Sequence, residues 1–308
     1  MNNVKWSRVA GLLLVVMALS GLFAQTSGQE KKKQGQKSKI EFIIPPEGKV
    51  QILRTRDGSE LIGRIVKIGR KNILFESDLG RTEIRKASVR SLTMVDADKV
   101  RGGEVWFENP NATRMFFAPT ARTLKSGNGY FADVYLFFPS VAYGLTDNIT
   151  IGGGISLFPN VPFDEQLLYL TPKVGFSIGE SAHGAVGVLL LRMPDFSDNA
   201  DNPLGVGILY GVTTFGSMDK SITAGLGYGF VDKEVADRPM VILGGEWRVS
   251  RRVSLVTENW VLPGLDGGLV SYGVRFFGRK LSVDLAFWSP TEEFLFPGIP
   301  YVDFVYTF

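Results

Sequence analysis

The chain contains one histidine, His183, and no cysteine, so few of the common catalytic arrangements are open to it. Ser–His catalysis needs a histidine beside its serine, and His183 closes a segment with the composition of a short turn, residues 179–183. Asp284 and Asp303 could approach each other as a carboxylate dyad, but an ion pair with Arg275 is the simpler role for them. We therefore expect that the protein is not an enzyme.

Metal and cofactor motifs are also missing from the sequence. No cluster of histidine or cysteine suits zinc, and no loop has the spacing of a calcium site. The polar run that contains Asp198, Asn199, Asp201 and Asn202 could bind a cation, although a plain surface loop explains it as well. Gly152-Gly153-Gly154 is not a phosphate loop, because no Lys-Ser/Thr pair follows it. We expect no metal and no cofactor.

Charged residues recur on one face of several segments in which polar and apolar residues alternate. Counting the alternation from each segment places these side chains on the inward face of a barrel: Asp133, Lys173, Glu246, Arg248, Glu258, Arg275, Asp284 and Asp303. They can pair across strands and lock the interior, or they can line a path for ions. Mixed signs on neighbouring segments favour pairing. Glycines assigned to the same interior favour open volume instead: Gly152, Gly154, Gly205, Gly207, Gly211, Gly225, Gly227 and Gly229.

The elements that would hold these residues are strand-length segments, about twelve in number. They are residues 113–123, 130–143, 149–158, 166–178, 185–193, 204–215, 221–231, 240–249, 253–261, 269–277, 281–288 and 301–308. Short connections such as residues 144–148 alternate with longer ones such as residues 125–129 and 289–300, as in barrels that cross a membrane. No connection is long enough to fold into the barrel. The fold class is all-β, with an antiparallel transmembrane β-barrel of about twelve strands over residues 112–308.

Aromatic residues support the membrane interpretation at two places. Those near segment ends would form girdles at the two membrane interfaces: Phe158, Trp247, Trp260, Phe277 and Trp288. The last segment places Val302, Phe304, Tyr306 and Phe308 on one face and ends the chain on an aromatic. This pattern resembles the C-terminal strand of bacterial outer-membrane β-barrels. The resemblance implies that these residues close the barrel and are recognised by the barrel-assembly machinery.

The start of the chain has the order of a secretory signal. Lys5 and Arg8 precede an apolar run, residues 9–23, and the small Ala24 follows, so we expect a signal peptide over residues 1–24. Residues 25–39 form a polar, lysine-rich linker. The expected location is the bacterial outer membrane, with lipid as a partner and the N-terminal domain in the periplasm. A net charge of only +3 gives no argument for nucleic acid.

Residues 40–97 read as a small periplasmic β-domain of about five short strands, followed by a linker over residues 98–111. The stretch Leu53-x-x-x-Asp57-Gly58-Ser59-Glu60-Leu61-x-Gly63-x-Ile65 resembles the first motif of Sm-like and SH3-like small barrels. Sm-like proteins often bind RNA, but the signal peptide exports this domain, so that activity does not carry over. Its many arginines and lysines could favour an acidic partner, such as a periplasmic protein or peptidoglycan.

Two functions remain open. The chain as a whole is similar to Gram-negative outer-membrane barrels that carry a small periplasmic β-domain. The first function is a narrow, porin-like passive channel for small polar solutes or ions. The second is a non-conducting barrel that anchors the periplasmic domain for envelope assembly or attachment.

Overall fold

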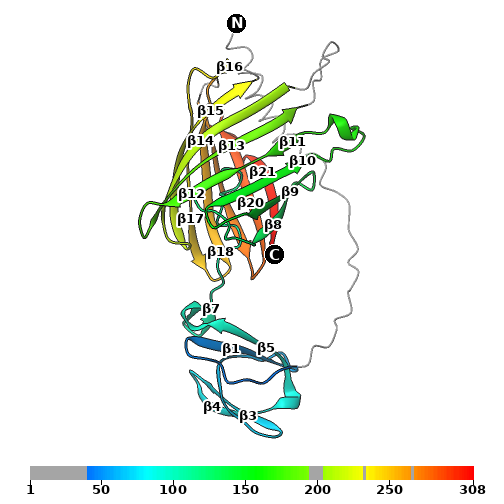
Figure 1. The fold of residues 1–308 in the computed structure, drawn as a ribbon, viewed down its shortest axis with the longest axis vertical. Helices are drawn as coiled ribbons and strands as arrows, with labels where there is room; N and C mark the ends of the chain where they lie inside the picture. The colour runs from blue at the N-terminus through cyan, green and yellow to red at the C-terminus, as the bar shows by residue number, and fades with distance from the viewer. Residues whose placement is uncertain (1–39, 194–203, 232–233, 265–266) are drawn as a thin grey trace. The chain divides into compact units, whose positions relative to one another are not determined.

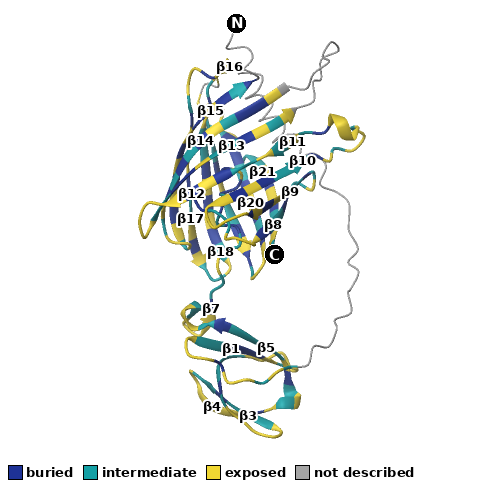
Figure 2. Cartoon of the chain, in the orientation of Figure 1, coloured by how far each residue is buried: buried dark blue, intermediate teal, exposed yellow. Residues whose placement is uncertain are grey.

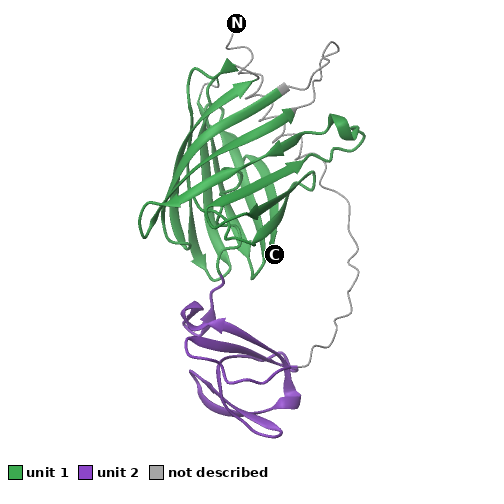
Figure 3. Ribbon diagram, in the orientation of Figure 1, with its two compact units in different colours: residues 1–25, 108–308 green, residues 26–107 purple. Residues whose placement is uncertain are grey.

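The computed structural model describes residues 40–193, 204–231, 234–264 and 267–308. The expected signal peptide and lysine-rich linker lie outside the described residues, as does the polar run 198–202. The chain divides into two compact units between Phe107 and Glu108 (Figure 3). Each unit is described by itself below.

The smaller unit is an antiparallel sheet in the order β4-β3-β2-β1-β5 (Figure 1). Its strands are β1 (Lys49–Thr55), β2 (Glu60–Ile68), β3 (Asn72–Ser77), β4 (Gly80–Arg85) and β5 (Val89–Asp96), with short 3-10 helices η2 (Lys86–Ser88) and η3 (Ala97–Lys99). Gly63 in β2 lies so close to β3 that a Cβ there would be 2.0 Å from the carbonyl oxygen of Glu76. Its place in the Sm-like or SH3-like class stays a prediction.

Two hydrophobic clusters stabilise this unit. Leu53, Ile65, Ile73, Phe75, Ile84 and Val89 form the first cluster. Ile52 belongs instead to a second cluster with Val95 and Val105. Val105 comes from a small hairpin of β6 (Val100–Arg101) and β7 (Glu104–Val105). Residues 100–107, expected to lie in a linker, therefore contribute to the core of the smaller unit.

The larger unit contains a closed, antiparallel barrel of twelve strands. Its strands are β8 (Gly129–Val134), β9 (Phe138–Gly144), β10 (Ile149–Ile155), β11 (Leu168–Leu170), β12 (Lys173–Ser177), β13 (Ala182–Met193), β14 (Leu204–Gly216), β15 (Lys220–Val231), β17 (Met240–Ser250), β18 (Val253–Val261), β19 (Gly268–Phe277), β20 (Leu281–Pro290) and β21 (Ile299–Thr307). β11 and β12 are two parts of one strand, because both pair with β10 and with β13. The last strand, β21, pairs with the first, β8, and this pairing closes the barrel.

Two short elements lie in the connections: the 3-10 helix η4 (Phe163–Glu165) and β16 (Glu234–Val235), which pairs with the end of β15. The short turns that follow β9, β12, β14, β17 and β19 lie at the same end of the barrel as Phe308. Among the described residues, no helix is long and apolar enough to cross a bilayer.

Buried and exposed residues alternate along most strands of the barrel (Figure 2). In β15 the buried positions are Ser221, Thr223, Gly225, Gly227, Gly229 and Val231, and the exposed positions between them include Ile222 and Leu226. The outward face of the barrel is therefore rich in exposed apolar side chains. Its inward face holds small, polar and charged side chains together with a buried apolar cluster.

Two of the expected strands are wrong, although the count of about twelve strands is right. Residues 113–123 form no strand. Residues 130–143 form two strands, β8 and β9, joined by a tight turn in which Tyr135 and Leu136 have positive φ angles of 57° and 68°. Residues 125–129 are accordingly no outer loop: Ser126 donates a backbone hydrogen bond to Asp147 in the turn after β9. The expected strand over residues 113–123 is absent, and the expected strand over residues 130–143 is two strands, so the total number of strands is unchanged.

The direction of several side chains also differs from expectation. Trp288 and Phe277 are buried inside the barrel, and Trp260 shares the inward face with Glu258, so these three belong to no girdle. In β14 the glycines 205, 207 and 211 face outward, because their neighbours Val206, Tyr210 and Val212 pair with inward positions of β15. A Cβ at Gly207 would lie 2.1 Å from the outward ring of Phe230.

Candidate functional site

The interior of the barrel is occupied by the chain itself. Residues 109–122, here called the plug segment, precede the first strand and are largely buried. The segment turns back on itself: the backbone N–H of Met115 donates to Ala118 (2.8 Å), and that of Thr120 donates to Thr113 (3.0 Å). An isolated bridge joins Arg114 to Pro119. The plug segment is therefore a compact hairpin that pairs with no barrel strand.

Glu258 of β18 holds the tip of this hairpin. Its Oε2 accepts hydrogen bonds from three consecutive backbone N–H groups, those of Phe116 (2.8 Å), Phe117 (2.9 Å) and Ala118 (2.9 Å). Its Oε1 accepts from the indole Nε1 of Trp260 (2.8 Å). Consecutive N–H groups that point at one oxygen form an anion-binding concavity. Here the anion is a side chain of the wall, and the concavity belongs to the plug segment.

Arg275 of β19 joins the wall to the plug segment through an ion network. Its guanidinium binds both carboxylate oxygens of Asp284 at 2.8 Å, and its Nη1 lies 2.8 Å from Glu246. It also donates to the carbonyl oxygens of Asn111 (3.0 Å) and Met115. A guanidinium can occupy its donors in this way because they are fixed in one plane. Every charge in the network is therefore paired.

Polar side chains of the plug segment also bind the wall carboxylates. Asn109 Nδ2 donates to both oxygens of Glu246 at 2.8 Å, and Asn111 Nδ2 reaches Asp284 at 3.4 Å. Arg114 forms an ion pair with Asp303 of β21. Asp284 and Asp303 are direct partners across β20 and β21. They bind different arginines, which removes the need for a shared proton.

The opposite wall holds the plug segment through its backbone. Lys173 Nζ donates to the carbonyl oxygens of Thr113 (3.1 Å), Thr120 (3.0 Å) and Arg122 (2.6 Å). The backbone N–H of Ala121 donates to Thr214 Oγ1 at 2.8 Å. Because three donors of one ammonium group are used, the position of both arms of the hairpin is fixed at once.

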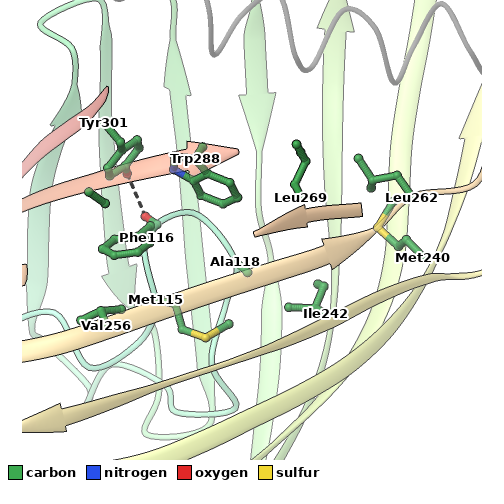
Figure 4. Close-up of a cluster of buried hydrophobic side chains, with 11 residues drawn as sticks. Met115, Phe116, Ala118, Met240, Ile242, Val256, Leu262, Leu269, Trp288 and Tyr301 are labelled. Carbon is green, nitrogen blue, oxygen red and sulfur yellow. Dashed lines mark hydrogen bonds between the residues drawn. The ribbon is translucent and has the colours of Figure 1, made fainter. Parts of the chain in front are cut away.

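Apolar packing accompanies these polar contacts. Met115, Phe116 and Ala118 lie in one buried cluster with side chains of β17 to β21 (Figure 4). The rings of Phe116, Trp288 and Tyr301 contact one another in a triangle, with centroid distances of 6.3 Å (Phe116 to Trp288), 5.6 Å (Phe116 to Tyr301) and 6.4 Å (Trp288 to Tyr301). The Tyr301 hydroxyl donates to the carbonyl oxygen of Phe116 at 3.0 Å. This wall and the plug segment therefore share one hydrophobic core.

A cavity of about 240 Å³ lies beside the plug segment, lined mainly by apolar side chains. The plug segment contributes Arg114, Phe117 and Pro119 to it, and the wall contributes residues from both sides of the barrel, including Leu189, Ile208 and Ile242. Tyr135, Leu167 and Pro263 place it toward the end opposite Phe308. The ring of Phe117 is 40% exposed although it lies inside the barrel, because it borders this cavity.

The structure places most of the expected interior residues against the plug segment. Those that contact it are Lys173, Glu246, Glu258, Arg275, Asp284 and Asp303. Arg248 instead binds Asp219 in a turn and lies over the ring of Phe277. Asp133 accepts from the backbone N–H of Phe138 across the turn that joins β8 to β9. A role of these residues in lining a conducting path stays a prediction.

The sequence reasoning missed the plug residues Asn109, Asn111, Arg114 and Arg122. A signal was present: residues 113–123 contain two arginines and a proline at position 119 without regular alternation. Proline is uncommon inside a sheet because it cannot donate a hydrogen bond. Both features argue against a strand that faces lipid.

No catalytic arrangement stands out in the described part of the chain. His183 lies in β13, where its backbone is opposite Ser177 of β12 and Thr214 of β14, and its imidazole makes no hydrogen bond to another described residue. No group of histidine, aspartate and glutamate side chains within the described ranges could hold a metal ion.

The solved structures to which this chain is similar include outer-membrane proteins. The protein OmpT of Vibrio cholerae, with loop L8 deleted, is 13% identical over 84% of this chain and 96% of its own, with a TM-score of 0.31. OmpF of Salmonella typhi, in complex with daunomycin, is 8% identical over 85% of this chain and 95% of its own, also at 0.31. OccK5 of Pseudomonas aeruginosa is 10% identical over 84% and 95%, again at 0.31.

At these TM-scores the likeness carries no argument about function. The closed barrel is established by its own strand pairing. No family model matches the chain, and no curated protein matches its sequence.

Proposed function

We propose that this chain is a bacterial outer-membrane β-barrel that its own plug segment keeps closed, and that it serves as a non-conducting anchor for the smaller, basic unit. The observation that carries this proposal is the occupation of the barrel by residues 109–122, bound to side chains from β12, β14, β15 and β17 to β21. The outward belt of exposed apolar side chains, such as Leu209, Leu226 and Leu243, supports insertion into lipid.

The position of the plug segment along the chain supports the anchor function. The smaller unit ends at Phe107, and the plug segment begins at Asn109. The smaller unit is thus joined covalently to a segment that is buried inside the barrel. In this proposal the smaller unit faces the periplasm, and its basic surface binds an acidic partner such as peptidoglycan or a periplasmic protein. Val302, Phe304, Tyr306 and Phe308 serve as the recognition signal for barrel assembly.

Planar-bilayer conductance of the mature protein tests this proposal. We expect no steady current from the wild type, and a steady current from a variant in which a Gly–Ser linker of equal length replaces residues 109–122. A matched control carries a Gly–Ser insertion in the turn at residues 278–280 and stays silent. A wild type that conducts steadily would rule out the closed barrel.

A passive channel for small polar solutes or ions is the second candidate, and one observation favours it. Because the plug segment pairs with no barrel strand, it can leave without breaking the sheet. Glu246, Arg275 and Asp284 would then line the path and set its ion preference. In this alternative the barrel conducts only while the plug segment is displaced.

A disulfide can separate the two candidates, because the chain has no cysteine of its own. Ala121→Cys and Thr214→Cys would join the plug segment to β14 at a point where the two residues are already hydrogen-bonded. A gated channel would show current bursts that disappear on oxidation and return on reduction. Silence in both states supports the anchor, and bursts that persist after complete oxidation exclude gating by the plug segment.

A further inference from the structure

The apolar cavity beside the plug segment has features of a binding site. We propose that it binds one uncharged, largely apolar small molecule that carries a single polar atom. This inference concerns the part of the interior that the plug segment does not occupy, so it does not depend on whether the barrel conducts.

The volume of the cavity sets the size of the ligand. The cavity measures about 240 Å³. An apolar cavity of about 150 Å³ holds benzene, and sites for drug-sized molecules begin at about 300 Å³. The ligand is therefore larger than benzene and smaller than a typical drug, which corresponds to a two-ring aromatic molecule or a short alkyl chain.

The charges around the cavity exclude an ionic ligand. Arg114 and Lys173 both border the cavity. Arg114 is paired with Asp303, and Lys173 donates to three carbonyl oxygens of the plug segment. Neither cation is left for an anionic ligand. Transfer of an unpaired ion into such surroundings is strongly unfavourable.

The walls leave room for the ligand through two glycines. The hydroxyl of Tyr210 would lie 2.4 Å from a Cβ at Gly187, and that of Tyr169 would lie 2.5 Å from a Cβ at Gly154. Any larger residue at these glycines would push the rings inward. Glycine at both positions therefore keeps the two phenol rings flat against the wall and preserves the open volume.

Two tyrosine hydroxyls that border the cavity indicate that the ligand carries one polar atom. Tyr130 and Tyr210 both line it, and within the described residues no protein hydrogen bond is made by either hydroxyl. Tyr130 is half-buried and Tyr210 is buried. Buried tyrosine hydroxyls usually have a partner. One hydroxyl or carbonyl oxygen on the ligand would supply it.

Equilibrium dialysis of 1-naphthol against the full mature protein in nanodiscs tests the proposal, with empty nanodiscs of the same lipid as the blank. We expect one saturable equivalent per barrel. Ile208→Trp fills the cavity and should weaken binding at least about tenfold, which is about 1.4 kcal/mol. The control is Leu209→Trp, the next residue of β14, which is 61% exposed on the outer face and should bind as the wild type does. Val206→Phe is a second filling variant if Ile208→Trp does not fold.

A second probe tests the class of ligand. 1-Naphthalenesulfonate has the same rings and a permanent negative charge, so we expect it to bind at least about tenfold more weakly than 1-naphthol. Absence of saturable 1-naphthol binding, or unchanged binding in both filling variants, would overturn the site. Tighter binding of the sulfonate would overturn the assignment of an uncharged ligand.

Discussion

Glu258 shows at the scale of single residues why the interior charges are structural. Its side chain is fully buried, and its two carboxylate oxygens accept four hydrogen bonds, from three backbone N–H groups and one indole. Arg275 is equally buried and satisfies two carboxylates and two carbonyl oxygens. A buried charge is tolerated only with such partners.

Replacement of Glu258 by glutamine keeps the shape of the side chain and removes its charge. Hydrogen bonds to a charged group contribute about 1.5–3 kcal/mol each, so we expect Glu258→Gln to lower the free energy of unfolding by a few kcal/mol in urea titrations. Hydrogen exchange measured by mass spectrometry should become faster at the amides of Phe116, Phe117 and Ala118. Glu180→Gln, in an exposed turn, is the control. Unchanged exchange at these three amides would contradict the assigned role of Glu258.

The inward direction of several charged residues could be predicted from the sequence, but their binding partners could not. Alternation places Arg275, Asp284 and Asp303 on the inner face, because their neighbours along each strand are apolar. The same counting places Glu246 and Glu258 on the inner face, although Glu258 has the polar neighbours Thr257 and Asn259. The partners could not be read in this way. Arg114 and Asp303 are 189 residues apart, and no local pattern links them.

The plug segment illustrates the same limit at the scale of elements. Its length and apolar residues resemble those of a barrel strand, and Gly–x–Gly patterns in β14 and β15 look alike although they face opposite sides. The alternation of residue types shows that a strand has two different faces, but in a glycine-rich strand it does not show which face meets lipid. If the wrong face is chosen, every side chain of that strand is predicted to point in the wrong direction. The sequence predicts the terminal strand β21 and its inward face, because the charged Asp303 lies between the apolar Val302 and Phe304.

Spin labels distinguish a plug segment from a membrane strand. A nitroxide at Ala118→Cys should show low accessibility to oxygen, because Ala118 is buried between the plug segment and the wall. A nitroxide at Leu226→Cys, on the outer face of β15, should show the high accessibility of a lipid-facing site. Equal oxygen accessibility at the two sites in reconstituted vesicles would show that residues 113–123 face lipid after all.

At the scale of the whole molecule, the boundary between the two units is the informative feature. The alternation of strands and turns in the sequence predicts that the small domain ends near residue 97, because regular strands stop there. Val105 lies in the second cluster with Ile52 and Val95, and Val100 and Phe107 pack against it. A short hairpin after the main sheet gives almost no periodic signal, and for this reason the sequence could not reveal it.

Two fragments test this boundary. We expect residues 40–107 to unfold cooperatively in urea, and residues 40–97 to be less stable by about 2–5 kcal/mol, the usual cost of removing a large buried apolar side chain. Circular dichroism against urea concentration measures the difference. Val105→Ala in the longer fragment should account for part of the loss. Equal stability of the two fragments would place the boundary at residue 97.

The plug segment also fixes an order of events during assembly. It precedes every barrel strand in the chain, yet its ion pairs and its apolar cluster depend on β17 to β21, the last strands to be synthesised. Contacts between such distant parts of a chain form slowly. The interior can therefore reach its final packing only after the last strand has arrived, so a barrel that lacks this strand keeps unpaired charges inside and differs chemically from a finished one.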